Sequence, residues 1–150
     1  MDSEDRFDLV VKNTEEVVTP EELRELLQTK RSPRGHIGFE PSGLAHIGWV
    51  ICSNKVRDFI EAGFEFTIFF ADWHAYINDK LGGDLEAIRT CARYMEDCFE
   101  ALGVPGEKVE YKYASHLLSD IDYWERVINI GKVSSLKDRK STRLNSSHRY

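Results

Sequence analysis

Short apolar runs alternate along this chain with two long amphipathic stretches, and this alternation is the feature that most constrains the fold. Residues 36–39, 64–71 and 109–113 contain the aromatic and β-branched side chains that are typical of strands. Residues 46–62 and 84–102 carry apolar side chains at spacings of three and four, which is the period of a helix. The order strand, helix, strand, helix, strand is that of a parallel sheet with crossover helices. We therefore predict an α/β fold with a Rossmann-like sheet.

Further helices are predicted on both sides of this core. Residues 4–13 place apolar side chains on one face. A second helix is predicted to begin at Thr19, which has Glu22 at the spacing of a capping box. Residues 120–130 are predicted to form a last helix, and we expect His116 to lie in the loop that precedes it.

The composition is that of a globular protein with one core and excludes several other classes. Hydrophobic residues make up 41% of the chain and charged residues 31%. The longest apolar run, residues 64–71, is too short to cross a bilayer, and the acidic amino terminus is unlike a secretory signal. Three cysteines without a Cys-x-x-Cys pair indicate buried thiols in a reducing cytosol, so we expect a cytoplasmic protein without a metal site. A net charge of −6 gives no strong basic surface for nucleic acid.

The segment 40–49 joins the first predicted strand to the first long helix and could carry chemistry. Backbone N–H groups at a helix start favour phosphate, and the glycines at 43 and 48 would let a nucleotide approach the backbone closely. His46 could donate to a phosphate oxygen as charge builds there. On these residues alone, a nucleotide site and an ordinary surface turn are supported about equally.

Two segments resemble a known family. The order Gly-Phe-Glu-Pro-Ser-Gly-x-x-His-Ile-Gly in residues 38–48 resembles the first signature of class I aminoacyl-tRNA synthetases, in the branch specific for tyrosine and tryptophan. Residues 70–80, Phe-Ala-Asp-Trp-His-Ala-Tyr-Ile-Asn-Asp-Lys, resemble the second strand end and the following loop of the tyrosyl form. The resemblance extends over about residues 5–137 and points to tyrosyl-tRNA synthetases of the archaeal or eukaryotic type.

The resemblance implies an activity and a site. It implies ATP-dependent activation of tyrosine to tyrosyl-adenylate and transfer to tRNA(Tyr), in a full-length protein that is a homodimer. Mg²⁺ would accompany ATP through its phosphates rather than through a protein cage. His46 would be the catalytic residue, stabilising the α-phosphate region. The residues implied along ATP are Ser42, Gly43, His46, Gly48 and Trp49. Those implied around the amino acid are His36, Gly38, Glu40, Ala71, Asp72 and His74.

Two residues depart from the family pattern and leave alternatives open. His36 stands where the family usually has a tyrosine that meets the substrate phenol, and Trp49 replaces a second histidine. A tryptophan-tRNA ligase fragment, a non-catalytic synthetase-like module that binds nucleotide or RNA, and another nucleotidyltransferase of the same superfamily remain as alternatives. His74 is also open to interpretation as a packed core histidine.

The last residues differ in character from the rest. Residues 138–148 match an in-frame translation of a common sequencing adapter, Asp-Arg-Lys-Ser-Thr-Arg-Leu-Asn-Ser-Ser-His. We expect residues 1–137 to be the N-terminal part of a synthetase catalytic domain and residues 138–150 to be a disordered artefact. The family's lysine-bearing loop and its pocket aspartate would come later in the chain, so we expect residues 1–150 to be inactive alone.

Overall fold

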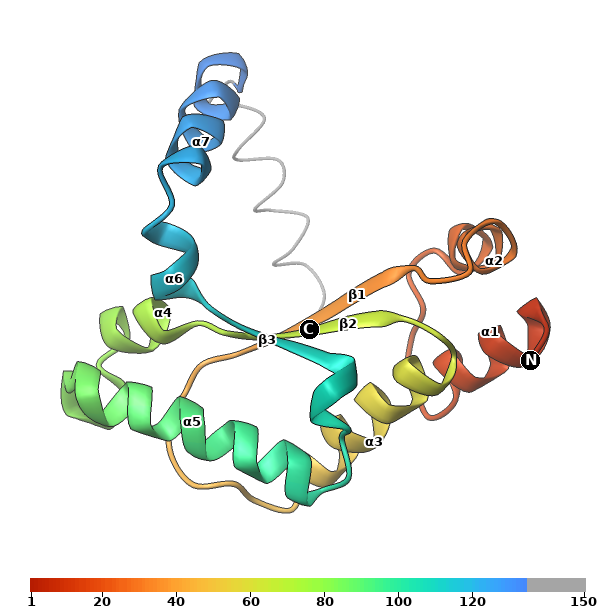
Figure 1. The fold of residues 1–150 in the computed structure, drawn as a ribbon, viewed down its shortest axis with the longest axis horizontal. Coiled ribbons are helices and arrows are strands. Elements are labelled where there is room, and N and C mark those ends of the chain that lie inside the picture. Colours follow the sequence, from red (N-terminus) through yellow and green to blue (C-terminus); the bar gives the residue numbers. More distant parts are fainter. Residues whose placement is uncertain (135–150) are drawn as a thin grey trace. The chain divides into compact units, whose positions relative to one another are not determined.

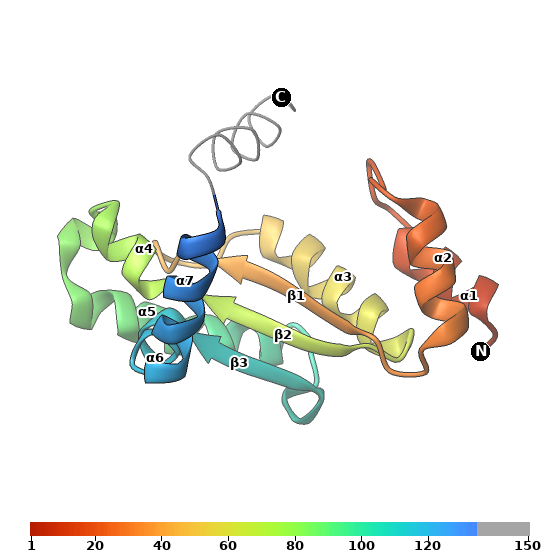
Figure 2. The same ribbon diagram turned by 90° about the horizontal axis from the view of Figure 1, so that it is seen from above.

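The computed structural model describes residues 1–134, and residues 1–114 are built around a parallel sheet. Its strands are β1 (Arg34–Phe39), β2 (Glu65–Phe70) and β3 (Val109–Tyr113), hydrogen-bonded in the order β1-β2-β3. All three run in the same direction, as Figure 2 shows. The predicted α/β class and parallel sheet are therefore confirmed. The strand bounds agree with the prediction to within two residues, and those of β3 agree fully.

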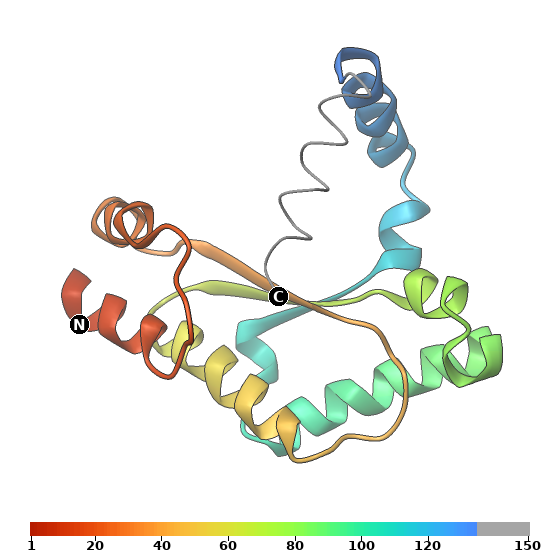
Figure 3. The same ribbon diagram turned by 180° about the vertical axis from the view of Figure 1, so that it is seen from behind.

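Helices connect the strands on one side of the sheet. Helix α3 (Gly48–Glu61) leads from β1 to β2. The connection from β2 to β3 contains α4 (Asp72–Ile77), the 3₁₀ turn η1 (Lys80–Gly83), α5 (Leu85–Ala101) and the 3₁₀ turn η2 (Gly106–Lys108). Both α3 and α5 lie on the same side of the sheet (Figures 1 and 3). This arrangement brings the loop after β1 and the loop after β2 to one end of the sheet.

The core fills the space between these helices and one face of the sheet. On β2, Phe66, Ile68 and Phe70 are buried, whereas the residues between them are more exposed. Phe99 and Met95 of α5 are buried against the same face. The apolar run of residues 64–71 forms a strand that is buried on one face. Buried and more exposed residues alternate along β2 because α3 and α5 cover only one of its faces.

Two N-terminal helices, α1 (Ser3–Val11) and α2 (Pro20–Thr29), precede the sheet, as predicted. Arg6 of α1 links this helix to the end of α3 and to α2: its Nε donates to the carbonyl of Ala62 at 2.7 Å, and its Nη1 donates to the carbonyl of Leu27 at 3.0 Å. The predicted capping box at Thr19 is wrong. Thr19 lies at the N-cap, but its backbone (φ −135°, ψ 73°) departs from the extended conformation of a cap, and its side chain makes no capping bond.

Contacts divide the chain after Ala114 into two compact units. The second contains most of α6 (Ala114–Leu118) and all of α7 (Ile121–Val133). His116 therefore lies in a short helix and not in the expected loop. Asp120 caps α7 by accepting the N–H of Asp122 at 3.0 Å. The boundary expected at residue 137 and the segment 138–150 lie outside the described residues. None of the helices in residues 1–134 is long and apolar enough to span a membrane.

Candidate active site

The carboxyl ends of β1 and β2 bring two of the sequence-predicted segments together. Phe39 and Phe70 are register partners, and the N–H of Ala71 donates to the carbonyl of Phe39 at 2.8 Å. This bond holds Ala71 against the last residue of β1, and Glu40 follows that residue directly. Ligands of open α/β sheets bind at this end of the strands.

Glu40 is held by residues that follow α4. The side-chain amide of Asn78 donates to Glu40 Oε1 at 2.9 Å, and Lys80 Nζ lies 4.0 Å from Oε2. The backbone between and after these partners is unusual, because Asp79 (φ 51°) and Leu81 (φ 52°) adopt the left-handed conformation without being glycine. These contacts order the Glu40 carboxylate at the mouth of the site.

Asp72 and His74 begin a helix and not the loop that was expected after β2. Asp72 is fully buried, and its Oδ1 accepts the N–H of Trp73 at 3.0 Å, which places the carboxylate at the start of α4. His74 is exposed, so its interpretation as a packed core histidine is wrong. Its role toward a substrate stays a prediction.

His46 is oriented by the glycine two residues after it. The N–H of Gly48 donates to His46 Nδ1 at 3.2 Å. Because Nδ1 accepts in a neutral ring, this bond assigns the proton to Nε2 and leaves Nε2–H as a donor. A Cβ at position 48 would lie 2.9 Å from His46 Cε1, so only glycine leaves the ring in this place.

The first amides of α3 do not face outward as expected. The N–H of Gly48 is bonded to the His46 ring, that of Trp49 donates to the carbonyl of His46 at 2.9 Å, and that of Val50 donates to the carbonyl of Ile47 at 3.1 Å. The first turn thus satisfies its own donors. His46 Nε2 is therefore the better candidate for contact with a phosphate.

The other predicted residues fall on different surfaces. Trp49 packs into the core, with its ring centroid 5.9 Å from that of Phe39 and 5.4 Å from that of Phe99. His36 is exposed on the face of β1 that α3 and α5 leave uncovered, and Gly38 shares that face.

The structure brings Glu40, Ala71 and Asp72 together, and it places Ser42, Gly43 and His46 in the adjoining loop. The roles of all these residues toward substrates stay predictions.

Two tyrosines on β3 face the carboxylates of α5. Burial, with the charges of Glu100 and Glu96, raises the pKa of Tyr111 to about 12. Tyr113 donates to Glu96 Oε1, and burial together with this bond raises the pKa of Tyr113 above its usual value. Both phenols are therefore neutral at physiological pH and cannot act there as bases.

Comparison with known proteins assigns the family. Residues 28–149 match the model of the tRNA synthetases class I (W and Y). The chain belongs to this family. The family expected from the sequence is thereby confirmed, and with it the nucleotide-binding Rossmann-type fold.

Similar proteins of this synthetase family come from archaea. The chain is 51% identical over 136 residues to the tyrosine–tRNA ligase of Aeropyrum pernix, covering 91% of the chain and 37% of that protein. It is 44% identical to that of Sulfolobus acidocaldarius, covering 93% of the chain and 39% of that protein. It thus spans less than two fifths of these relatives.

Solved structures agree with the curated relatives. The crystal structure of the Aeropyrum pernix tyrosyl-tRNA synthetase superposes with a TM-score of 0.84 at 50% identity, over 91% of this chain and 42% of that one. That of the Pyrococcus horikoshii enzyme complexed with L-tyrosine superposes with a TM-score of 0.78 at 44% identity, over 91% of this chain and 39% of that one.

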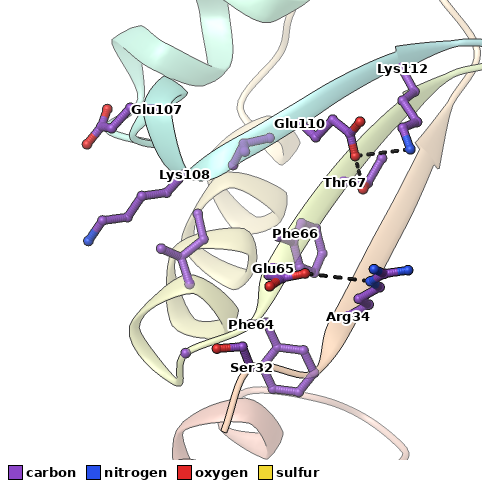
Figure 4. Close-up of a pocket in the computed structure, with 13 residues that line it drawn as sticks. Ser32, Arg34, Phe64, Glu65, Phe66, Thr67, Glu107, Lys108, Glu110 and Lys112 are labelled. Atoms are coloured by element: carbon purple, nitrogen blue, oxygen red, sulfur yellow. Dashed lines mark hydrogen bonds and ion pairs between the residues drawn. The ribbon is translucent and has the colours of Figure 1, made fainter.

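The chain also has a cavity of about 800 Å³ away from the candidate site (Figure 4). Charged side chains that line the cavity form ion pairs with one another. Arg34 Nε lies 3.6 Å from Glu65 Oε2, and Glu110 Oε2 lies 3.0 Å from Lys112 Nζ and accepts from the Thr67 hydroxyl at 3.4 Å. The cavity contains none of the predicted site residues and begins at the amino ends of the strands. We therefore do not assign it to the nucleotide.

Proposed function

We propose that the full-length protein is a tyrosine–tRNA ligase, which activates tyrosine with ATP and transfers it to tRNA(Tyr). The observation that carries the proposal is the meeting of the His46 loop, Glu40 and Asp72 at the carboxyl ends of β1 and β2. The names of the relatives, which match 91% and 93% of the chain, support tyrosine over tryptophan. The structure complexed with L-tyrosine supports the same choice.

The first step forms tyrosyl-adenylate. The carboxylate of tyrosine attacks the α-phosphorus of ATP, a new O–P bond forms, and the bond to the bridging oxygen of the β-phosphate breaks as pyrophosphate leaves. His46 Nε2–H donates to an α-phosphate oxygen, where negative charge grows in the transition state. Mg²⁺ reaches the site on the ATP phosphates, since it dehydrates reluctantly and is commonly held through substrate phosphates.

Two carboxylates suit the amino-acid side of the site. Glu40 is ordered by Asn78 and Lys80, and Asp72 is buried at the start of α4. Carboxylates accept hydrogen bonds from an ammonium group and stabilise its charge. His36 is exposed on the uncovered face of β1, and we propose that it meets the far end of the substrate, where an imidazole can accept from or donate to a phenol. Ala71, His74 and Gly38 complete the proposed wall.

Exchange of pyrophosphate into ATP tests the proposal. With the full-length protein, tyrosine should support exchange and tryptophan should give the background rate. The same preparation should charge tRNA(Tyr) and elute as a homodimer, and we expect it in the cytoplasm.

The 150-residue chain is the control for the full-length protein. It should show no tyrosine-dependent exchange of pyrophosphate, because it supplies only part of the site. Exchange that depends on tryptophan would replace tyrosine with tryptophan as the substrate. ATP binding without any exchange by the full-length protein would support a non-catalytic module instead.

A further inference from the structure

The loop between β1 and α3 is tied to α5 by two side chains. The thiol of Cys91 donates to the carbonyl of Gly43 at 3.3 Å, and the N–H of Ala45 donates to the hydroxyl oxygen of Tyr94 at 3.4 Å. Within residues 1–134, the backbone of residues 41–45 makes these two hydrogen bonds and no others. The loop therefore depends on α5 for its polar contacts.

Apolar packing holds the first residue of this loop but not its middle. Pro41 is fully buried, whereas Leu44 is 81% exposed and Ile47 is 85% exposed, so neither of these two side chains reaches the core. Gly43 has a φ of 148°, a conformation that residues with a side chain rarely adopt. A loop with exposed apolar side chains and a permissive glycine would sample many conformations unless other groups restrain it.

The two restraining side chains form one surface of α5. Cys91 and Tyr94 are three residues apart and thus lie on the same face of the helix. Cys91 is buried at the edge of the core, which fixes its sulfur. A hydrogen bond with Cys98 raises the pKa of Tyr94, although the Ala45 N–H lowers it, so the phenol stays neutral near pH 7.

We propose that Cys91 and Tyr94 are positioning residues for the nucleotide. They hold the carbonyl of Gly43 and the amide of Ala45, and the residue that follows is His46. The two contacts thereby set where His46 Nε2 meets the α-phosphate. This inference rests on the proposed function and extends it, because neither side chain itself contacts the substrate.

Variants of the 150-residue chain separate positioning from folding. Tyr94→Phe removes only the hydroxyl, and Tyr123→Phe, in the second unit, is its matched control. Cys91→Ala removes the donor, whereas Cys91→Ser keeps one. We expect Tyr94→Phe to speed hydrogen exchange of the Ala45 amide by roughly 3- to 10-fold, since one hydrogen bond is lost.

The nucleotide gives the second measurement. A titration with Mg-ATP, followed by amide chemical shifts, should show affinity reduced roughly 3- to 10-fold in Tyr94→Phe and in Cys91→Ala. Cys91→Ser should recover most of the loss, and Tyr123→Phe should match the wild type. The thermal midpoint of Tyr94→Phe should stay within about 2 °C of the wild type, because this surface contact adds little to stability.

The outcomes distinguish this inference from the proposed function. Wild-type affinity in both Tyr94→Phe and Cys91→Ala would overturn the positioning role alone, even if exchange of the Ala45 amide became faster. A loss of affinity that follows a lowered thermal midpoint would also overturn it, because it would show a structural role. A wild-type chain that does not bind Mg-ATP would overturn the proposed nucleotide site, and the positioning role with it.

Discussion

Replacing His46 with alanine should slow tyrosyl-adenylate formation by the full-length protein about 10²- to 10³-fold, as the loss of one pre-positioned donor does in other enzymes. The hydrogen bond from the Gly48 N–H to His46 Nδ1 holds the ring in place before ATP arrives. In the alanine variant no other group of this turn can take the place of the Nε2–H donor. The effect should fall on kcat for tyrosine-dependent pyrophosphate exchange and leave KM for ATP nearly unchanged, because the bond strengthens as charge grows in the transition state.

Two further variants make the His46 result specific. His46→Gln can place an N–H near the position of Nε2 and should retain more activity than His46→Ala. His116→Ala, on α6 in the second unit, should match the wild type. If His46→Ala exchanged pyrophosphate at the wild-type rate, His46 would have no role in catalysis.

Truncation of Phe99 to alanine should lower the free energy of unfolding by about 3–5 kcal/mol, the usual cost of removing a fully buried phenylalanine. Phe99 is 0% exposed, and its ring centroid lies 5.3 Å from that of Phe39 and 5.4 Å from that of Trp49. One side chain thus joins α5, the end of β1 and the first turn of α3. Its loss leaves a cavity at the point from which the His46 loop starts.

Urea unfolding of the 150-residue chain measures this cost. Ile51→Ala is the control, because Ile51 is 72% exposed on α3, and its truncation should change stability by about 0.5 kcal/mol or less. Phe99→Leu keeps most of the volume and should cost about 1–2 kcal/mol. A Phe99→Ala variant that loses no more stability than Ile51→Ala would show that these three rings do not form the core contact described.

The order of the main elements could be predicted from the sequence because each carries its own periodicity. The apolar stripe of residues 85–101 has the period of a helix, and the short run 109–113 has the composition of a strand. The short helices α4 and α6 were missed, since six and five residues are too few to show a helical period. Thr19 shows a second limit: its spacing from Glu22 was right, but its backbone conformation prevents the cap.

The contacts of the candidate site could be predicted only where the two residues lie close together in the sequence. His46 and Gly48 are two residues apart, so their pairing lies within one motif. The contacts that support the loop span 38 to 49 residues, as those of Glu40 with Asn78 and of Ala45 with Tyr94 show. Such contacts depend on how α4 and α5 pack beside β1, and no pattern along one sequence specifies that. Trp49 packs into the core, as the apolar period of residues 46–62 predicts, whereas the nucleotide contact implied by the resemblance stays a prediction.

If the nucleotide binds at the carboxyl ends of β1 and β2, beside the His46 loop, Mg-ATP should perturb the backbone there. A titration of the 150-residue chain with Mg-ATP, followed by amide chemical shifts, measures this. The largest shifts are expected at Gly43, Ala45 and Gly48. Shifts confined to Thr67, Glu110 and Lys112, which line the cavity at the other end of the sheet, would contradict it.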